Sequence, residues 1–191
     1  MNKATSDALR AGYIDIDLKT KILRLEQYGR KENLVISGIA DDMSDSEAES
    51  KFLDSVKLVG IEIPPSEVVA FHKIKKDNNR IARFKNRRSV ESILRKGRDL
   101  EAADKRNIWG NNIDLKVFPN LSPEYLKLRY FCKKLKQDGY IVAFGFNGIG
   151  VWAKQSEDSN RTQIDCNDDA AKFLPEGMTC VEFLLRHQRP S

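Results

Sequence analysis

The order of strand-like and helix-like segments in the middle of the chain constrains its fold more than any other feature. Runs rich in apolar and β-branched residues predict strands. The four predicted strands occupy residues 33–39, 68–75, 80–85 and 113–118. Amphipathic patterns predict two helices, one over residues 46–59 with Ser46 as its N-cap and Gly60 at C′, the other capped by Asn86. The segments therefore follow one another as β-α-β-β-α-β.

This order is the split βαβ arrangement of ferredoxin-like domains, which RNA-recognition-motif (RRM) domains share. We therefore predict an α+β protein with an RRM-like domain over residues 32–119. A short N-terminal helix precedes it within residues 1–31, where Leu18, Ile22 and Leu25 have the four-then-three spacing of a coiled-coil seam. Only about two heptads precede Gly29, so the pattern fits both an oligomer-forming coiled-coil stub and a local helix packed on the body of the protein.

A second, small α+β domain is predicted over residues 120–191. Ser122 is a suitable N-cap and Pro123 fits the first helical position, so a helix begins there. The pair Asn147-Gly148 separates two β runs, which is the pattern of a hairpin with a two-residue type I′ turn. A third strand at residues 161–165 and a short helix at 167–174 complete the predicted domain.

Charge is segregated along the chain. The formal net charge of +5 is modest, but residues 41–67 carry eight acidic and two basic residues, whereas residues 72–98 carry eleven basic and two acidic. A block of one sign attracts polyanions, and the total charge does not report it. Arginine is frequent in the basic block, and its guanidinium binds phosphate through two hydrogen bonds and stacks on bases.

In the predicted strand 80–85, alternation places Ala82 and Phe84 toward the helices, with Arg83 and Lys85 on the open sheet face where an RRM binds RNA. The open positions of the two central strands carry no stacking aromatic residue, which predicts electrostatic binding with weak sequence selectivity. The first helix of the second domain adds further cations. The residues predicted to contact nucleic acid are Lys75, Arg80, Arg83, Lys85, Arg87, Arg88, Arg95, Arg98, Lys116, Lys127, Arg129 and Lys134.

Other classes of function find little support. Neither His72 nor His187 has a partner at metal-ligand spacing, and the glycines near Asn147 lie inside a predicted hairpin rather than in a phosphate loop. The three cysteines are scattered, as is usual in a reducing compartment. There is no signal-like start and no apolar run long enough to span a bilayer. We expect a non-enzymatic intracellular protein, cytoplasmic or nuclear, with no cofactor, metal or membrane partner.

Several segments, in order, look familiar. They are residues 30–39 (RKENLVISGI), 70–74 (AFHKI), Arg83-Phe84 with 93–96 (ILRK), and 121–124 (LSPE) with 127–129 (KLR). They resemble the opening, second strand, third strand with second helix, and C-terminal domain of LINE-type retrotransposon first-open-reading-frame proteins, the transposase-22-like group. The FP-protein family, named for a baculovirus few-polyhedra protein, has a similar opening. The resemblance extends over about residues 18–174.

This resemblance implies a coiled-coil oligomer, often a trimer, followed by an RRM-like domain and a C-terminal domain that together clamp single-stranded nucleic acid. It also implies ribonucleoprotein assembly and nucleic-acid chaperone activity, with Arg95, Arg98 and Arg129 contacting RNA. The FP branch implies instead a structural protein whose sheet and basic block bind a protein partner. The sequence leaves RNA and DNA, and the two branches, as alternatives.

Overall fold

The computed structural model describes residues 18–74, 78–102, 115–147 and 150–187. Contacts divide the chain into two compact units. One is Arg30–Asn120, and the other joins the N-terminal segment, Met1–Gly29, to Leu121–Ser191. The fold is α+β with two antiparallel sheets. In the described part of the chain, no helix has the length and hydropathy needed to cross a bilayer.

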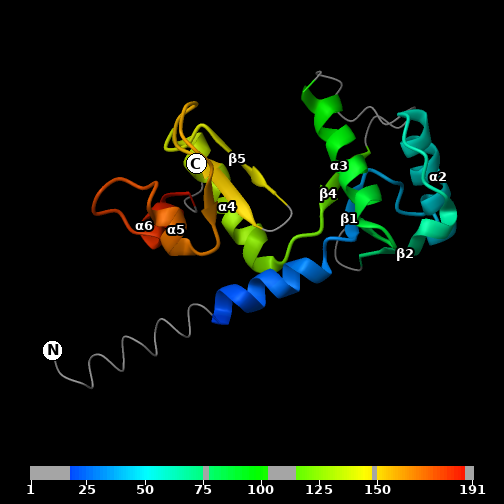
Figure 1. The fold of residues 1–191 in the computed structure, drawn as a ribbon, viewed down its shortest axis with the longest axis horizontal. Helices are drawn as coiled ribbons and strands as arrows, with labels where there is room; N and C mark the ends of the chain where they lie inside the picture. Colours follow the sequence, from blue (N-terminus) through cyan, green and yellow to red (C-terminus); the bar gives the residue numbers. More distant parts are fainter. Residues whose placement is uncertain (1–17, 75–77, 103–114, 148–149, 188–191) are drawn as a thin grey trace. The chain divides into compact units, whose positions relative to one another are not determined.

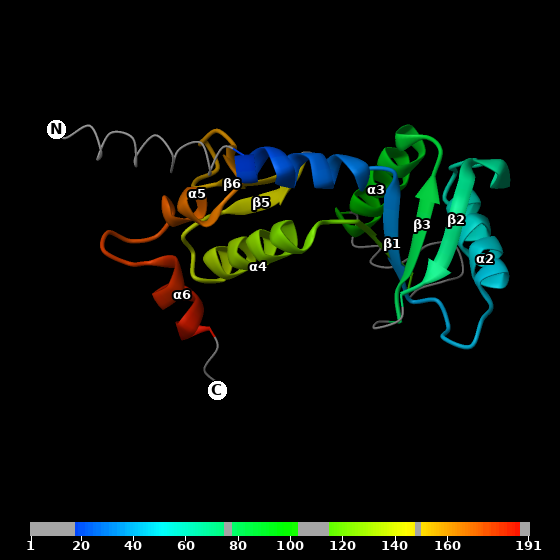
Figure 2. The same ribbon diagram turned by 90° about the horizontal axis from the view of Figure 1, so that it is seen from below.

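The middle unit contains a four-stranded sheet covered on one face by two helices (Figure 1, Figure 2). The sheet order is β2-β3-β1-β4, and every neighbouring pair is antiparallel. Its elements follow the predicted order, with a short 3-10 turn η1 (Pro65–Glu67) added before β2. They are β1 (Asn33–Ser37), α2 (Asp45–Leu58), β2 (Val68–Lys73), β3 (Arg80–Phe84), α3 (Arg87–Ala102) and β4 (Lys116–Pro119).

The core of this unit lies between the sheet and the two helices. Leu34 and Ile36 alternate with half-buried neighbours on β1, and both are fully buried. Ala82 and Phe84 of β3 are also fully buried, which confirms their predicted orientation. They pack with Phe52 of α2 in one apolar cluster. Burial of such side chains is worth about 1.5–3 kcal/mol each, so this layer stabilises the unit.

The N-cap of helix α2 lies two residues earlier than predicted. Ser44, not Ser46, is the N-cap: its Oγ accepts the Glu47 N–H at 3.3 Å, and the Glu47 carboxylate accepts the Ser44 N–H at 3.0 Å. Ser46 also has a glutamate three residues later, so the sequence contains two overlapping capping boxes. The earlier box places Asp45 in the first turn, where it pairs with an arginine of the sheet. Gly60 follows the C-cap with φ of +87°, as predicted for C′.

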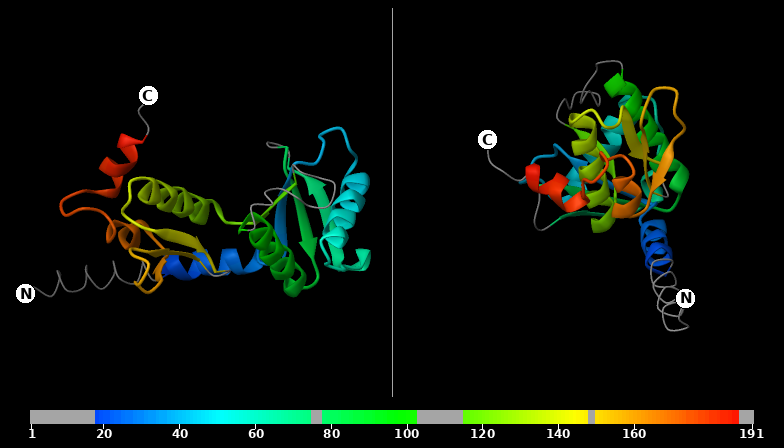
Figure 3. Two further views of the ribbon diagram at one scale, coloured as in Figure 1. Left: turned by 90° about the horizontal axis from the view of Figure 1, so that it is seen from above. Right: turned by 90° about the vertical axis from the view of Figure 1, so that its left-hand side faces the viewer.

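The second unit combines a three-stranded sheet with helices of its own. Its helix α4 packs on β5 and β6 (Figure 3), and Ser122 caps this helix with Pro123 at its first position, as predicted. A further helix near the C-terminus, α6, was not predicted; Thr179 and Glu182 form its capping box. The elements are α4 (Pro123–Gln137), β5 (Ala143–Phe146), β6 (Val151–Lys154), β7 (Thr162–Ile164), α5 (Asn167–Ala171) and α6 (Cys180–Arg186).

The β5–β6 connection differs from the prediction. Phe146 pairs with Val151, so residues 147–150 link the two strands. The prediction of a two-residue turn is therefore wrong. The Asn147 side chain closes this longer loop by accepting the Gly150 N–H at 3.0 Å. A Cβ at Gly150 would lie 2.1 Å from Nε2 of Gln163, so a larger residue there would push the end of that side chain out of its hydrogen bonds with Asn147 and Asp165. Close packing, rather than positive φ in a tight turn, explains this glycine.

The N-terminal helix, which covers residues 18–29, packs on the second unit. Leu23 packs on the apolar core, and the buried Gln27 accepts the Ser122 N–H at 2.9 Å. The stripe Leu18, Ile22 and Leu25 lies on the other side and is 52%, 63% and 73% exposed. The helix therefore uses one face locally and leaves the predicted seam in solvent.

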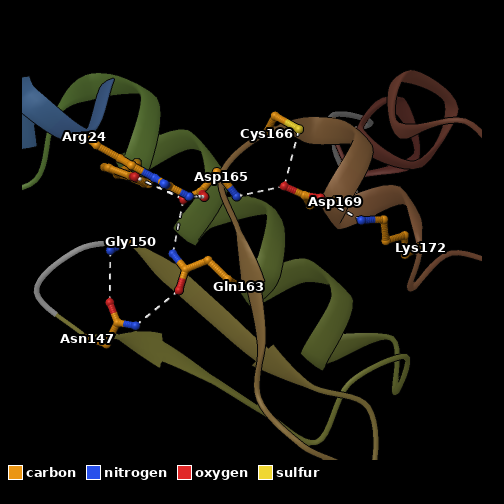
Figure 4. Close-up of polar contacts among 9 residues, drawn as sticks. Arg24, Asn147, Gly150, Gln163, Asp165, Cys166, Asp169 and Lys172 are labelled. Atoms are coloured by element: carbon orange, nitrogen blue, oxygen red, sulfur yellow. Dashed lines mark hydrogen bonds and ion pairs between the residues drawn. The ribbon is translucent and has the colours of Figure 1, made fainter. Parts of the chain in front are cut away.

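A chain of polar contacts connects this helix to the second unit (Figure 4). The Arg24 guanidinium pairs with the Asp165 carboxylate at 2.5 Å. The same carboxylate accepts hydrogen bonds from the Tyr125 hydroxyl at 3.2 Å and from the Gln163 amide at 3.1 Å. Burial, followed by the charge of Asp165, raises the pKa of Tyr125 well above its ordinary value, so the hydroxyl remains a donor. These groups satisfy one another, which indicates a structural role.

Candidate nucleic-acid interface

The junction between β3 and α3 gathers four of the predicted cations. Arg83, Lys85, Arg87 and Arg88 are all exposed. The Lys85 N–H donates to the Glu67 carbonyl at 2.8 Å, which fixes the chain as it leaves the strand. Asn86 then caps α3, because its Oδ1 accepts the Arg88 N–H at 2.9 Å. Backbone contacts therefore hold the cationic side chains at a defined turn.

Only some of the positive charges at this junction are neutralised by ion pairs. Arg87 forms an ion pair with Glu91 one turn later, at 2.7 Å. Burial, and next the Arg87 charge, lowers the pKa of Lys31, so another cation lies close by. Among the described residues, Arg83, Lys85 and Arg88 make no side-chain hydrogen bond or ion pair. They are available to an external anion.

Three arginines form a stripe on the solvent face of α3. Arg88, Arg95 and Arg98 are exposed and are seven and then three residues apart, which places them on one side of a helix. At 1.5 Å per residue the steps along the axis are about 10 Å and about 5 Å. None of the three has an acidic partner in the part of the chain that the structure describes. The three guanidinium groups are thus unpaired among the described residues, although the exposed carboxylates of Glu91 and Asp99 lie on the same side of the helix.

Besides Arg87, two more basic residues of the block form ion pairs within the middle unit. Arg80 is 2% exposed, and its guanidinium donates to the Asp45 carboxylate at 2.5 Å and to the Met43 carbonyl at 2.7 Å. Lys73 pairs with Asp41 in the same β1–α2 loop. The predicted phosphate contact of Arg80 is therefore withdrawn. The sequence contained the signal, because positions 80, 82 and 84 have the same parity in β3 and face the core together.

The open face of the sheet carries an aromatic residue that the sequence interpretation missed. Phe118 of β4 pairs with Val35, and Val35 also pairs with Ile81 of β3. Directly paired residues share a face, so Phe118 lies on the face turned away from α2 and α3. The central strands carry no aromatic residue there, as predicted, but the edge strand supplies one. Its alternation with Val117, which packs on the core, was the available signal.

Two predicted cations lie at opposite ends of this open face. Arg83 pairs with Asn33 in register, whereas Lys116 pairs with Ser37 at the other end of β1. Both side chains are exposed. Lys75 lies outside the described residues. The sheet therefore presents one cation near each end, with Phe118 on the row between them.

Helix α4 of the second unit carries the remaining predicted contacts. Lys127 and Arg129 are exposed, and the Lys134 ammonium lies 5.5 Å from the ring centroid of Tyr130. Lys127 and Lys134 are seven residues apart and share one flank of the helix, whereas Arg129 lies on another. The three cations thus do not form a single row.

Cysteine and acidic side chains of the second unit are candidate reactive groups or metal ligands. No group of three histidine, cysteine or acidic side chains there could hold a metal ion. Burial raises the pKa of the Cys132 thiol to about 12, so it is protonated near neutral pH. Burial alone would raise the pKa of Asp169, but hydrogen bonds from Lys172 and from the Asp165 N–H lower it. Cys132 is thus a buried thiol, whereas Asp169 is held by hydrogen bonds within its own unit.

Comparison with known proteins leaves the basic surfaces as the main guide to function. No protein-family model matches this chain, and no curated protein matches it closely enough to indicate homology.

Proposed function

We propose that this chain is a single-stranded nucleic-acid-binding protein that holds phosphates mainly through helix α3. The observation that carries the proposal is the exposed stripe of Arg88, Arg95 and Arg98, which has no acidic partner among the described residues. Guanidinium groups bind phosphate oxygens through paired, charge-assisted hydrogen bonds. A row of them along a helix suits a polyanion better than a single small anion.

We also propose that the middle unit is an RRM-like domain. The strand order β2-β3-β1-β4 with both helices on one face is the ferredoxin-like arrangement, and it supports this assignment. On the open face, Phe118 is a stacking platform for one base, and Arg83 and Lys116 contact the backbone on either side. Among the described residues, the ring side chains of the open face are Phe118 and His72, both on edge strands, so binding is mostly electrostatic and only weakly selective for sequence.

The wider role that we propose is retrotransposon-type ribonucleoprotein assembly with nucleic-acid chaperone activity. It rests on the motif resemblance and on the exposed stripe of Leu18, Ile22 and Leu25, which suits self-association. Sizing by light scattering, with and without RNA, tests the self-association. A protein that stays monomeric at all concentrations contradicts that part of the proposal.

Fluorescence anisotropy with a labelled oligouridylate tests nucleic-acid binding. With on the order of five phosphates neutralised, log affinity should fall with log salt at a slope of roughly −3.5. The double variant Arg95→Ala/Arg98→Ala should bind more weakly and flatten the slope by about 1.4. The matched control, Lys51→Ala/Lys57→Ala, removes two exposed charges from α2 of the same unit and should bind as wild type. A flat salt dependence in the wild type contradicts the proposal.

A protein partner is the second candidate. The row of Ile81, Val35 and Phe118 across the open face is apolar and half-buried, which also fits a protein surface. Nucleic acid that co-purifies with the protein, measured by the ratio of absorbance at the nucleic-acid and protein maxima, separates the candidates. Purification without nucleic acid, together with no oligonucleotide binding, favours the protein partner.

A further inference from the structure

A cavity of about 720 Å³ opens between α4 and β5 within the second unit. Six of its lining residues come from α4, and the seventh, Phe144, comes from β5. The α4 residues are Leu126, Arg129, Tyr130, Lys133, Lys136 and Gln137. The volume lies within the range of about 300–1,000 Å³ that is typical of small-ligand sites.

Part of the lining is apolar and partly open to solvent. Leu126 is 51% and Tyr130 is 49% exposed, although α4 buries its other large apolar side chains in the core. The two are four residues apart and therefore adjacent on the helix surface. Phe144 is half-buried and also packs on the core of the unit. Aromatic and aliphatic surface at the mouth of a cavity suits a flat, apolar ligand face.

The polar part of the lining has one sign. Arg129, Lys133 and Lys136 each line the cavity, and no acidic side chain does so. Within the described part of the chain these three cations form no ion pair or side-chain hydrogen bond. A fourth cation, the Lys134 ammonium, lies over the Tyr130 ring, 5.5 Å from its centroid. The cavity therefore combines an aromatic surface with uncompensated positive charge.

We infer that this cavity binds one unpaired nucleotide of a single strand, with its base stacked on Tyr130 and its flanking phosphates held by Arg129, Lys133 and Lys136. The inference rests on the proposed function and assigns it a specific base slot. A nucleotide presents a flat ring next to anionic oxygens, which matches both halves of the lining. An acidic peptide offers the charge, but it lacks the planar face that Tyr130 and Phe144 would cover.

The test compares oligouridylate with an oligomer of abasic ribose phosphates of equal length, again by anisotropy. Tyr130→Ala should weaken oligouridylate binding about tenfold and leave the abasic oligomer unchanged. Tyr130→Phe keeps the ring and should bind as wild type. Lys133→Ala/Lys136→Ala should weaken both oligomers. The control Leu185→Ala removes an equally exposed apolar side chain from α6 and should change neither. Far-UV circular dichroism verifies that each variant is folded.

Other outcomes overturn the inference in distinguishable ways. If Tyr130→Ala binds both oligomers as tightly as the wild type does, while Arg95→Ala/Arg98→Ala loses affinity, the base slot is refuted and the proposed function stands. Equal weakening of both oligomers by Tyr130→Ala excludes stacking. Displacement of oligouridylate by polyglutamate from the wild type, but not from Tyr130→Ala, assigns the cavity to an acidic protein. If the wild type binds neither oligomer, the proposed function fails together with the slot.

Discussion

Replacing Arg80 with alanine should destabilise the middle unit without removing a nucleic-acid contact. The side chain is 2% exposed, and its guanidinium donates to the Asp45 carboxylate and to the carbonyls of Met43 and Ala40. In the variant these three acceptors lose their donor. The β1–α2 loop and the first turn of α2 would no longer be fastened to β3.

The magnitude follows from how much water can replace the lost contacts. Removing one partner of a buried ion pair costs about 3–5 kcal/mol. Since the Asp45 side chain is 49% exposed, it regains hydration, and we expect the lower end, about 3 kcal/mol. In a unit of this size each kcal/mol shifts the melting temperature by about 4–8 °C, so the expected decrease is about 12–24 °C.

Thermal unfolding followed by circular dichroism, together with anisotropy at a temperature where the variant is folded, measures both effects. Arg83→Ala is the matched control, because Arg83 lies in the same strand and is exposed. It should change unfolding by less than about 0.5 kcal/mol and should weaken binding instead. An Arg80→Ala protein that melts like the wild type and binds RNA more weakly would refute the structural assignment of Arg80.

Three further outcomes are expected. Gly150→Ala should destabilise the second unit by about 1–3 kcal/mol in thermal melts, because its Cβ would clash with Gln163. The control Gly29→Ala should not destabilise it, because nothing lies within 4 Å of the new Cβ. Equal melting temperatures of the two variants would contradict the close packing at Gly150. Hydrogen bonds from the Ser44 side chain, and next from its N–H, lower the pKa of Glu47 below its ordinary value of 4.5. A group whose pKa is lowered by folding stabilises the protein at pH values above its ordinary pKa, and this stability is lost as the pH falls through the pKa of the folded state. The difference in melting temperature between wild type and Glu47→Gln should therefore shrink in acid. A difference that does not depend on pH would exclude this linkage. Burial raises the pKa of the Cys132 thiol to about 12, so the native protein should resist thiol reagents at this residue at pH near 8 and react there after denaturation. Peptide mass mapping measures the labelling. Rapid labelling of native Cys132 would contradict its burial.

Local periodicity and some of the capping signals were sufficient to predict structure. The order of elements in the middle unit, the inward orientation of Ala82 and Phe84, and the Ser122 cap of α4 all follow from short-range patterns. The cap of α2 did not follow, because Ser44 and Ser46 both precede a glutamate at the right distance. A tertiary contact, from Asp45 to Arg80, accompanies the cap that forms.

The candidate site was less accessible to sequence reasoning. The basic block was treated as one surface, but Arg80 points inward while Arg88, Arg95 and Arg98 point to solvent from a different layer. The cavity on the second unit could not be anticipated, because it requires Phe144 of β5 to pack beside α4. Charge along a sequence does not specify which cations share a face.

The packing of residues 18–29 on Leu121–Ser191 has a consequence for the order in which the protein folds during its synthesis. The middle unit is an insertion, in topological terms, into a unit whose two parts are far apart in the chain: Arg24 and Asp165 are separated by 141 residues. The Arg30 guanidinium donates to the Asn120 side chain at 3.4 Å, so the two ends of the insertion lie together. On the ribosome, the inserted unit can fold while the N-terminal helix still awaits its binding surface. The smallest fragment that forms the second unit should therefore be one in which the middle unit is deleted and residues 18–29 are joined to residues 121–187.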